Sequence, residues 1–239
     1  YGSQCTGSVV VLDVNDFSVL CAQSYPNYDL DKYMNDPQYR EDLLLNKDGQ
    51  NAMWNRCFWQ GYPIGSAMKP AVALAALQEG VIDTSTQFRC GYTYYNADMP
   101  DFHPLCMGTH GYLNVIEALT VSCNIFFYDT GYNLGIDNMN LYQRKLGLGE
   151  LTGVEIYESD GTLAGPDEKE NWYGGDTIMA AIGQSDNLIT PVQLATYAAT
   201  IANNGTRLRT HVVDKITDYS RQTVLEETKP EVVEENIFD

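Results

Sequence analysis

Ser66 and Lys69 have the residue types and the spacing that nucleophilic catalysis requires. They stand three residues apart, just before the almost wholly apolar run 71–77. This run predicts a helix that begins near Ser66 and ends before Gly80, and residues three apart share one helix face. Burial favours the neutral amine of a lysine, and unpaired N–H groups at a helix start favour developing negative charge. The pair therefore suits a serine nucleophile with a lysine base.

The same spacing also suits a helix-capping serine followed by a surface lysine, and the neighbouring wording favours the catalytic interpretation. Pro63-Ile64-Gly65-Ser66-Ala67-Met68-Lys69-Pro70 resembles the first motif of the penicillin-binding proteins. Ser122-Cys123-Asn124 resembles their second motif, Ser-x-Asn. The third motif of the family, K-T-G, is missing from the sequence after Gly205.

Further phrases carry the resemblance through the chain, from about Gly7 to about Val213. Thr152-Gly153-Val154-Glu155-Ile156 is similar to the family phrase TGIDL. Residues 175–184 and 190–194 match its GDT…IGQG…TPxQ stretch, with Ser185 in place of the usual second glycine. The wording around His110-Gly111 and Ser122 is most similar to the elongation-type D,D-transpeptidases of the family, penicillin-binding protein 2.

The resemblance implies roles for four residues. Ser66 would attack the penultimate D-Ala carbonyl of a peptidoglycan stem peptide ending in D-Ala-D-Ala, or a β-lactam carbonyl, with Lys69 as base. Ser122 would relay protons, and Asn124 would hold Lys69 and the substrate amide. One oxyanion donor would come from the K-T-G strand, so this stretch alone is expected to acylate slowly or not at all. A β-lactam sensor or a catalytically inactive relative is the alternative; a serine β-lactamase fits the later phrases less well.

Cys90, Cys106, His110 and Cys123 have the spacing C-x15-C-x3-H-x12-C, and a Cys3His set is a common closed zinc shell. The loop 81–111 has little periodic apolar content, so a metal crosslink would explain its order. The resemblance also favours zinc, because some members of the family carry zinc in this neighbourhood. A Cys90–Cys106 disulfide or three unlinked buried thiols remain open, and His103 is an alternative to His110.

The implied fold is α+β, a transpeptidase fold like that of penicillin-binding proteins and serine β-lactamases. It has a central antiparallel sheet flanked by helices. We expect one domain over 1–239, incomplete at its C-terminal end and truncated before the K-T-G strand. The β-branched runs 7–14 and 18–24, joined by Asn15-Asp16, predict a hairpin that would supply the first two strands.

The remaining sequence predicts helices and two polar excursions. We expect helices over 113–120, 125–135, 136–146 and 193–203. Ser122-Cys123-Asn124 separates the first of these helices from the second. Residues 31–51 are interpreted as a surface excursion with one short helical patch at 41–45, and 81–111 as a long loop. Cys5, Cys21 and Cys57 are interpreted as buried or unpaired thiols.

A net charge of −18 over 239 residues argues against a nucleic-acid partner, because phosphate binding needs clustered lysine and arginine. No apolar run reaches the length of a membrane span. The resemblance implies a protein on the extracytoplasmic face of the bacterial cell membrane, anchored by a segment outside this sequence. Its expected partners are stem peptides, β-lactam antibiotics and membrane proteins of the elongation complex.

Overall fold

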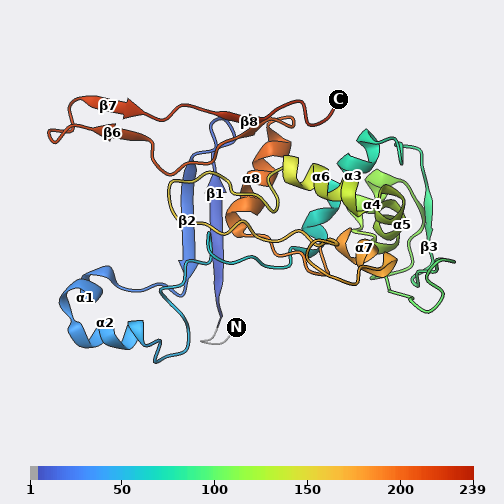
Figure 1. The fold of residues 1–239 in the computed structure, drawn as a ribbon, viewed down its shortest axis with the longest axis horizontal. Helices are drawn as coiled ribbons and strands as arrows, with labels where there is room; N and C mark the ends of the chain where they lie inside the picture. The colour runs from blue at the N-terminus through green and yellow to red at the C-terminus, as the bar shows by residue number, and fades with distance from the viewer. Residues whose placement is uncertain (1–4) are drawn as a thin grey trace.

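The computed structural model describes residues 5–239, so residues 1–4 of the expected domain lie outside it. Helices and short antiparallel sheets alternate through the chain, as the expected α+β class requires (Figure 1). The strands are β1 (Gly7–Leu12), β2 (Val19–Tyr25), β3 (Phe88–Cys90), β4 (Gly111–Leu113), β5 (Arg207–Leu208), β6 (Lys215–Thr217), β7 (Val224–Glu227) and β8 (Val232–Glu234). The helices are α1 (Leu30–Asn35), α2 (Pro37–Leu44), η1 (Gly65–Met68), α3 (Lys69–Gln78), α4 (Val115–Thr120), α5 (Asn124–Leu134), α6 (Ile136–Lys145), α7 (Gly174–Ala180) and α8 (Pro191–Ala202).

The predicted hairpin is confirmed as β1 and β2, which pair antiparallel from Gly7 opposite Tyr25 to Leu12 opposite Val19. It is the longest ladder among the described residues, whose sheets all have two strands. Helix α8 packs on β1 and lies between the hairpin and helices α3 to α7, whereas α1 and α2 lie beyond the other side of the hairpin (Figure 1). The hairpin therefore supplies the first two strands of the expected central sheet, with a helix on one face.

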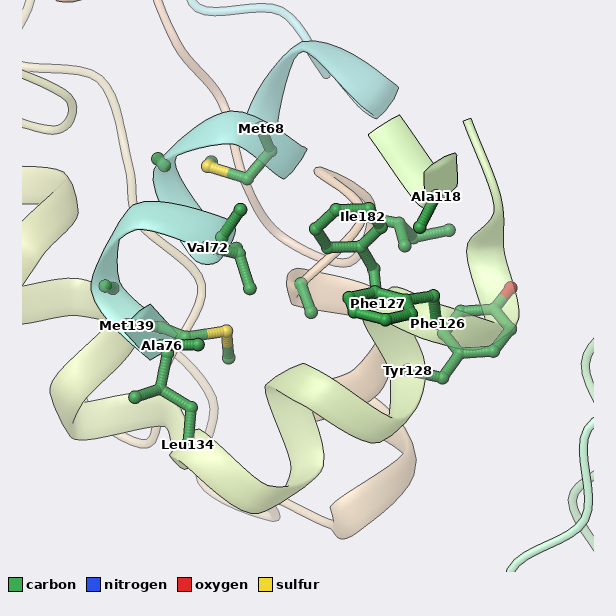
Figure 2. Close-up of a cluster of buried hydrophobic side chains, with 14 of the residues drawn as sticks. Met68, Val72, Ala76, Ala118, Phe126, Phe127, Tyr128, Leu134, Met139 and Ile182 are labelled. Atoms are coloured by element: carbon green, nitrogen blue, oxygen red, sulfur yellow. The ribbon is translucent and has the colours of Figure 1, made fainter. Parts of the chain in front are cut away.

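Helix α3 is the centre of the helical half, where it contacts α5 and α6 (Figure 2). Its alanines at positions 71, 73, 75 and 76 are at most 2% exposed, so neighbouring helices approach its backbone closely. Gly131 allows a similar close approach between α5 and Ala181, the residue that follows α7. A Cβ at position 131 would lie only 2.3 Å from the Cβ of Ala181. Small side chains thus let α3 and α5 bring the Ser66–Lys69 segment and residues 122–124 together.

The excursion 31–51 contains more helix than predicted. The expected patch at 41–45 is the end of α2, and α1 precedes it. Asp29 and Asp36 cap the two helices by accepting backbone N–H groups, and Pro37 occupies the first turn of α2. These are strong N-terminal signals, but neither helix has a buried residue, so the apolar period that reveals a helix is absent.

The loop 81–111 is largely irregular, as expected, and its two ends are joined. β3 pairs antiparallel with β4, with Phe88 opposite Leu113 and Cys90 opposite Gly111. The predicted helices at 113–120, 125–135, 136–146 and 193–203 are confirmed as α4, α5, α6 and α8, whereas α7 was not predicted. Within residues 5–239, no helix has both the length and the hydropathy needed to span a bilayer.

Candidate active site

Ser66 lies in the 3-10 turn η1, and Lys69 is the first residue of α3. A 3-10 turn has three residues per turn, so residues 66 and 69 point along the same face. Ser66 is exposed, whereas Lys69 is 1% exposed. The sequence prediction of a helix starting near Ser66 and ending before Gly80 is therefore correct, with a tighter first turn.

The turn before Ser66 is backed by Gly183. The Gly65 N–H donates to the Gly183 carbonyl over 3.1 Å. A Cβ at Gly183 would lie 2.2 Å from the Gly65 carbonyl oxygen, and Gly183 has φ of +72°. Both the close approach and the left-handed backbone require glycine at this position. Gly183 of the IGQ phrase thus packs against the turn that carries Ser66.

The second motif forms the break between α4 and α5. Ser122 has φ of +52°, a left-handed conformation that is uncommon outside glycine. Asn124 is the first residue of α5, so the predicted helix break at 122–124 is confirmed. Such strained residues gather at functional sites, where the surrounding structure holds them.

One hydrogen-bonded chain brings the four predicted residues together. Lys69 Nζ donates to the Ser122 carbonyl over 2.8 Å, to Ser122 Oγ over 3.0 Å and to Asn124 Oδ1 over 2.8 Å. The Ser122 hydroxyl donates to Ser66 Oγ over 3.0 Å. Among the described residues, no hydrogen bond joins Lys69 directly to Ser66. The hydrogen-bonded connection between Lys69 and Ser66 therefore passes through Ser122.

The environment of Lys69 favours loss of its proton. Burial lowers the pKa of Lys69 to about 8, because the ammonium loses hydration inside the protein. The three acceptors around Nζ and the ring of Phe127, 5.7 Å away, offset part of that cost. A lysine with this pKa exchanges a proton near neutral pH far more readily than an exposed one.

The cysteine-rich set also comes together as one cluster, in which the three cysteines are buried and His110 is half-buried. The ligand atoms of Cys90, Cys106, His110 and Cys123 all lie within 4.8 Å of one another. Nδ1 of His110 is 3.5 Å from the Cys90 sulfur and 3.7 Å from the Cys106 sulfur. The Cys106 and Cys123 sulfurs are 3.9 Å apart.

These separations fit one tetrahedral ion. At ordinary Zn–S and Zn–N distances, two tetrahedral sulfur ligands are about 3.8 Å apart, and a sulfur and a nitrogen about 3.6 Å. His103 is elsewhere: its Nδ1 contacts the Tyr94 carbonyl at 3.3 Å. All six cysteines of the described residues are free thiols in the structure, including Cys5, Cys21 and Cys57. The donor set therefore fits zinc through His110.

The two clusters lie back to back across residues 122–124. The Asn124 backbone N–H donates to the Cys106 sulfur over 3.3 Å, while the Asn124 side chain faces Lys69. Cys123 is fully buried, as expected for a side chain that points away from Ser66. Sequence patterns did not single out Leu105, whose carbonyl accepts from the Asn124 amide over 3.3 Å. Every residue type has a backbone carbonyl, so the sequence could not indicate that the carbonyl of Leu105 has this part.

The family model of the penicillin binding protein transpeptidase domain matches residues 7–239. The chain belongs to this family. It is 31% identical over 214 residues to the peptidoglycan D,D-transpeptidase MrdA of Acinetobacter baumannii, covering 87% of this chain and 32% of that protein. It is 33% identical over 217 residues to MrdA of Haemophilus influenzae, covering 88% and 33%.

Solved structures agree with the sequence comparison. PBP2 of Pseudomonas aeruginosa has a TM-score of 0.84 at 26% identity, over 95% of this chain and 50% of that one. PBP2 of Helicobacter pylori in complex with MreC has a TM-score of 0.78 at 27% identity, over 91% and 41%. The expected fold is thus confirmed. The chain spans about a third of the length of these MrdA relatives.

Proposed function

We propose that the protein is a peptidoglycan D,D-transpeptidase that forms an acyl-enzyme at Ser66 and is acylated there by β-lactams. The observation that carries the proposal is the chain from Ser66 through Ser122 to Lys69 and Asn124. It joins an exposed hydroxyl to a buried amine whose pKa lies near neutrality. Membership of the transpeptidase family and the similarity to MrdA proteins support the same reaction.

In acylation, Ser66 Oγ forms a bond to the carbonyl carbon of the penultimate D-Ala. As the bond forms, the Ser66 proton passes to Ser122 Oγ while the Ser122 proton passes to neutral Lys69. The protonated Lys69 returns a proton to the terminal D-Ala amine as the amide bond breaks. The amine of a second stem peptide then attacks the acyl-enzyme, which forms the cross-link and frees Ser66.

The test is the intact mass of the full-length protein after incubation with a penicillin. We expect one adduct, localised to the peptide that contains Ser66, and none in Ser66→Ala. An adduct that survives Ser66→Ala contradicts the assignment. A stable adduct without cross-linking of stem peptides in a transpeptidation assay would favour the β-lactam sensor, and no adduct at all would favour an inactive relative.

A second proposal concerns the cysteine cluster, which we infer binds a structural zinc ion through Cys90, Cys106, His110 and Cys123. Bound zinc would crosslink the loop 81–111 to the start of α5. The support is the fit of the sulfur and nitrogen separations to a tetrahedral shell. Zinc quantitation on protein purified without added metal should give about one ion per chain. Far less zinc, with Cys90 and Cys106 unreactive until reduced, would support the disulfide instead.

We further propose that the protein acts at the extracytoplasmic face of the bacterial cell membrane, in the cell-shape-determining elongation machinery. Similarity to MrdA proteins and to a PBP2 solved with MreC supports this setting. The expected partners are stem peptides, β-lactams and elongation-complex membrane proteins. Co-purification of the full-length protein with its own organism's MreC homologue tests the last of these, and a lack of association in detergent and in membranes would contradict it.

A further inference from the structure

A groove of about 540 Å³ lies between the loop segment 98–102 and the start of helix α7. Its apolar walls come from Met99 and Phe102 on the loop side and from Tyr173 and Met179 on the helix side. Phe102 is 40% exposed and Tyr173 is 67% exposed, so both rings are open to a ligand. Exposed apolar surface that gathers in one concave place commonly marks a binding site.

Two glycines lie where the walls of the groove meet. A Cβ at Gly174 would lie 3.2 Å from the Met99 sulfur, and a Cβ at Gly175 would lie 3.2 Å from the Phe102 ring. The loop therefore packs directly on the backbone at the start of α7, with no side chain between them. Larger residues at these two positions would push the walls apart.

The charges at the groove do not cancel. Lys169 forms an ion pair with Asp176, and both line the groove. Asp98 accepts a hydrogen bond from the Tyr132 hydroxyl over 2.7 Å, and Asp101 is exposed. In the part of the chain that the structure describes, neither Asp98 nor Asp101 has a cationic partner. Apolar walls beside two uncompensated carboxylates suit an aliphatic chain that ends in an ammonium group.

The loop wall of the groove leads to the proposed active site. Leu105 follows Phe102 by three residues, so their Cα atoms lie at most about 11 Å apart. The Leu105 carbonyl accepts from the Asn124 amide over 3.3 Å. The loop that lines the groove therefore reaches the hydrogen-bonded chain around Lys69.

The helix wall leads to the same place. The Met179 carbonyl accepts from the Gln184 N–H over 3.1 Å. The side-chain nitrogen of Gln184 lies 3.5 Å from the position of a Cβ at Gly65, the residue before Ser66. The two walls of the groove therefore continue to the proposed active site, one to Asn124 and the other to Ser66.

We propose that this groove binds the amine-bearing side chain of the stem peptide that acylates Ser66. The inference rests on the proposed function, in which the amine of one stem peptide attacks the acyl group of another. Donor and acceptor stems are copies of one peptide, so the donor carries the same amine. One extended residue and a four-carbon side chain span about 10 Å, which is enough to reach from the site to the groove. The apolar walls hold the carbons, and Asp98 and Asp101 attract the ammonium.

The test is the binding of two synthetic stem peptides to the full-length Ser66→Ala protein, which cannot form the acyl-enzyme, followed by NMR of the peptide. One peptide has a free side-chain amine. In the other the amine is acetylated, which removes the charge and keeps the aliphatic chain. We expect acetylation to raise the dissociation constant about 5-fold, the upper range for an exposed ion pair. Equal dissociation constants, or no binding of either peptide, overturn the proposal.

Two charge variants of the same protein show whether the preference arises in the groove. In Asp98→Asn/Asp101→Asn the two peptides should bind equally, and a preference that stays 5-fold overturns the proposal. Asp31→Asn/Asp48→Asn, at two exposed carboxylates near helices α1 and α2, is the matched control for net charge. This control should keep the preference, and its loss there would assign the effect to the overall charge and overturn the groove.

Phe102→Ala tests the apolar wall separately from the charges. The ring is partly exposed, so its removal should have little effect on folding. Both dissociation constants should rise about 5-fold while their ratio stays the same, because apolar contact with the aliphatic chain is lost. If neither constant rises, the proposal is overturned.

These binding measurements need no reaction, so their outcome is separate from that of the penicillin experiment. A wild-type protein without a penicillin adduct contradicts the proposed function. Equal binding of the two peptides contradicts the groove, whatever the penicillin result.

Discussion

The proposed catalytic cluster (Ser66, Lys69, Ser122 and Asn124) and the cysteine cluster (Cys90, Cys106, His110 and Cys123) meet at residues 122–124, but they are held together differently. In the catalytic cluster every polar atom of Lys69 and Asn124 has a hydrogen-bond partner within the protein. In the cysteine cluster the three cysteines are buried and His110 is half-buried, and the four ligand atoms lie within 4.8 Å of one another with no disulfide between them. Hydrogen bonds thus organise the first cluster without help, whereas the second has the composition of a site that a metal completes.

The comparison predicts that the catalytic cluster governs reaction rate with little effect on folding. Lys69→Met replaces a buried ammonium by an apolar chain of similar length, so the protein should remain folded. Acylation by penicillin should fall by about 10²–10⁴-fold, because the general base is lost. Stopped-flow acylation and thermal unfolding measure the two effects. Lys215→Met, at an exposed lysine, is the control, and acylation within threefold of wild type in Lys69→Met would contradict the role.

The cysteine cluster should govern stability. Cys90→Ser removes one of the four proposed zinc ligands, and we expect zinc content to drop and the free energy of unfolding to fall by more than about 3 kcal/mol. Denaturant unfolding and metal quantitation test this together. The matched control is Cys57→Ser, which alters a buried thiol outside the cluster and should leave zinc content unchanged. Equal losses of stability in the two variants would show that the cluster has no special role.

A variant in the segment 122–124, which the two clusters share, tests whether they act independently. Asn124→Ala removes a hydrogen bond to the Lys69 ammonium, and acylation should fall by about 10- to 100-fold. The backbone N–H that faces the Cys106 sulfur remains, so zinc content should not change. A parallel loss of zinc and acylation would show that the two clusters are a single unit rather than neighbours.

The smallest expected effect lies in the turn behind the nucleophile. Ser185 has φ of +62° at the place where the family phrase has glycine. Ser185→Gly should raise the free energy of unfolding by about 0.5 kcal/mol, because relief of left-handed strain slightly exceeds the added entropy of the unfolded chain. Gly183→Ala is the opposite case and should destabilise, since its Cβ would meet Gly65. Denaturant midpoints measure both, and a stabilising Gly183→Ala would contradict the close approach.

Local patterns in the sequence were enough to predict what depends on neighbours in the chain. The spacing of Ser66 and Lys69, the β-branched runs of the hairpin and the apolar periods of α5 and α6 each indicated their structure directly. The structure places His110, not His103, beside the three cysteines, while its role as a zinc ligand stays a prediction that rested on the neighbouring Gly111 and the resemblance. Helix α1 was missed because it has caps but no buried face.

Only the tertiary structure decided how distant residues connect. The resemblance implied that Ser122 relays protons, but only the structure shows its hydroxyl between Lys69 Nζ, at 3.0 Å, and Ser66 Oγ, at 3.0 Å, although Ser122 is 53 positions after Lys69 in the chain. The structure also brought Leu105 to Asn124. A carbonyl acceptor exists at every residue, so its direction depends on the folded backbone and not on residue type. The sequence by itself therefore indicated which groups suit the proposed chemistry, and the packing of α3 against α5 determined how they are joined.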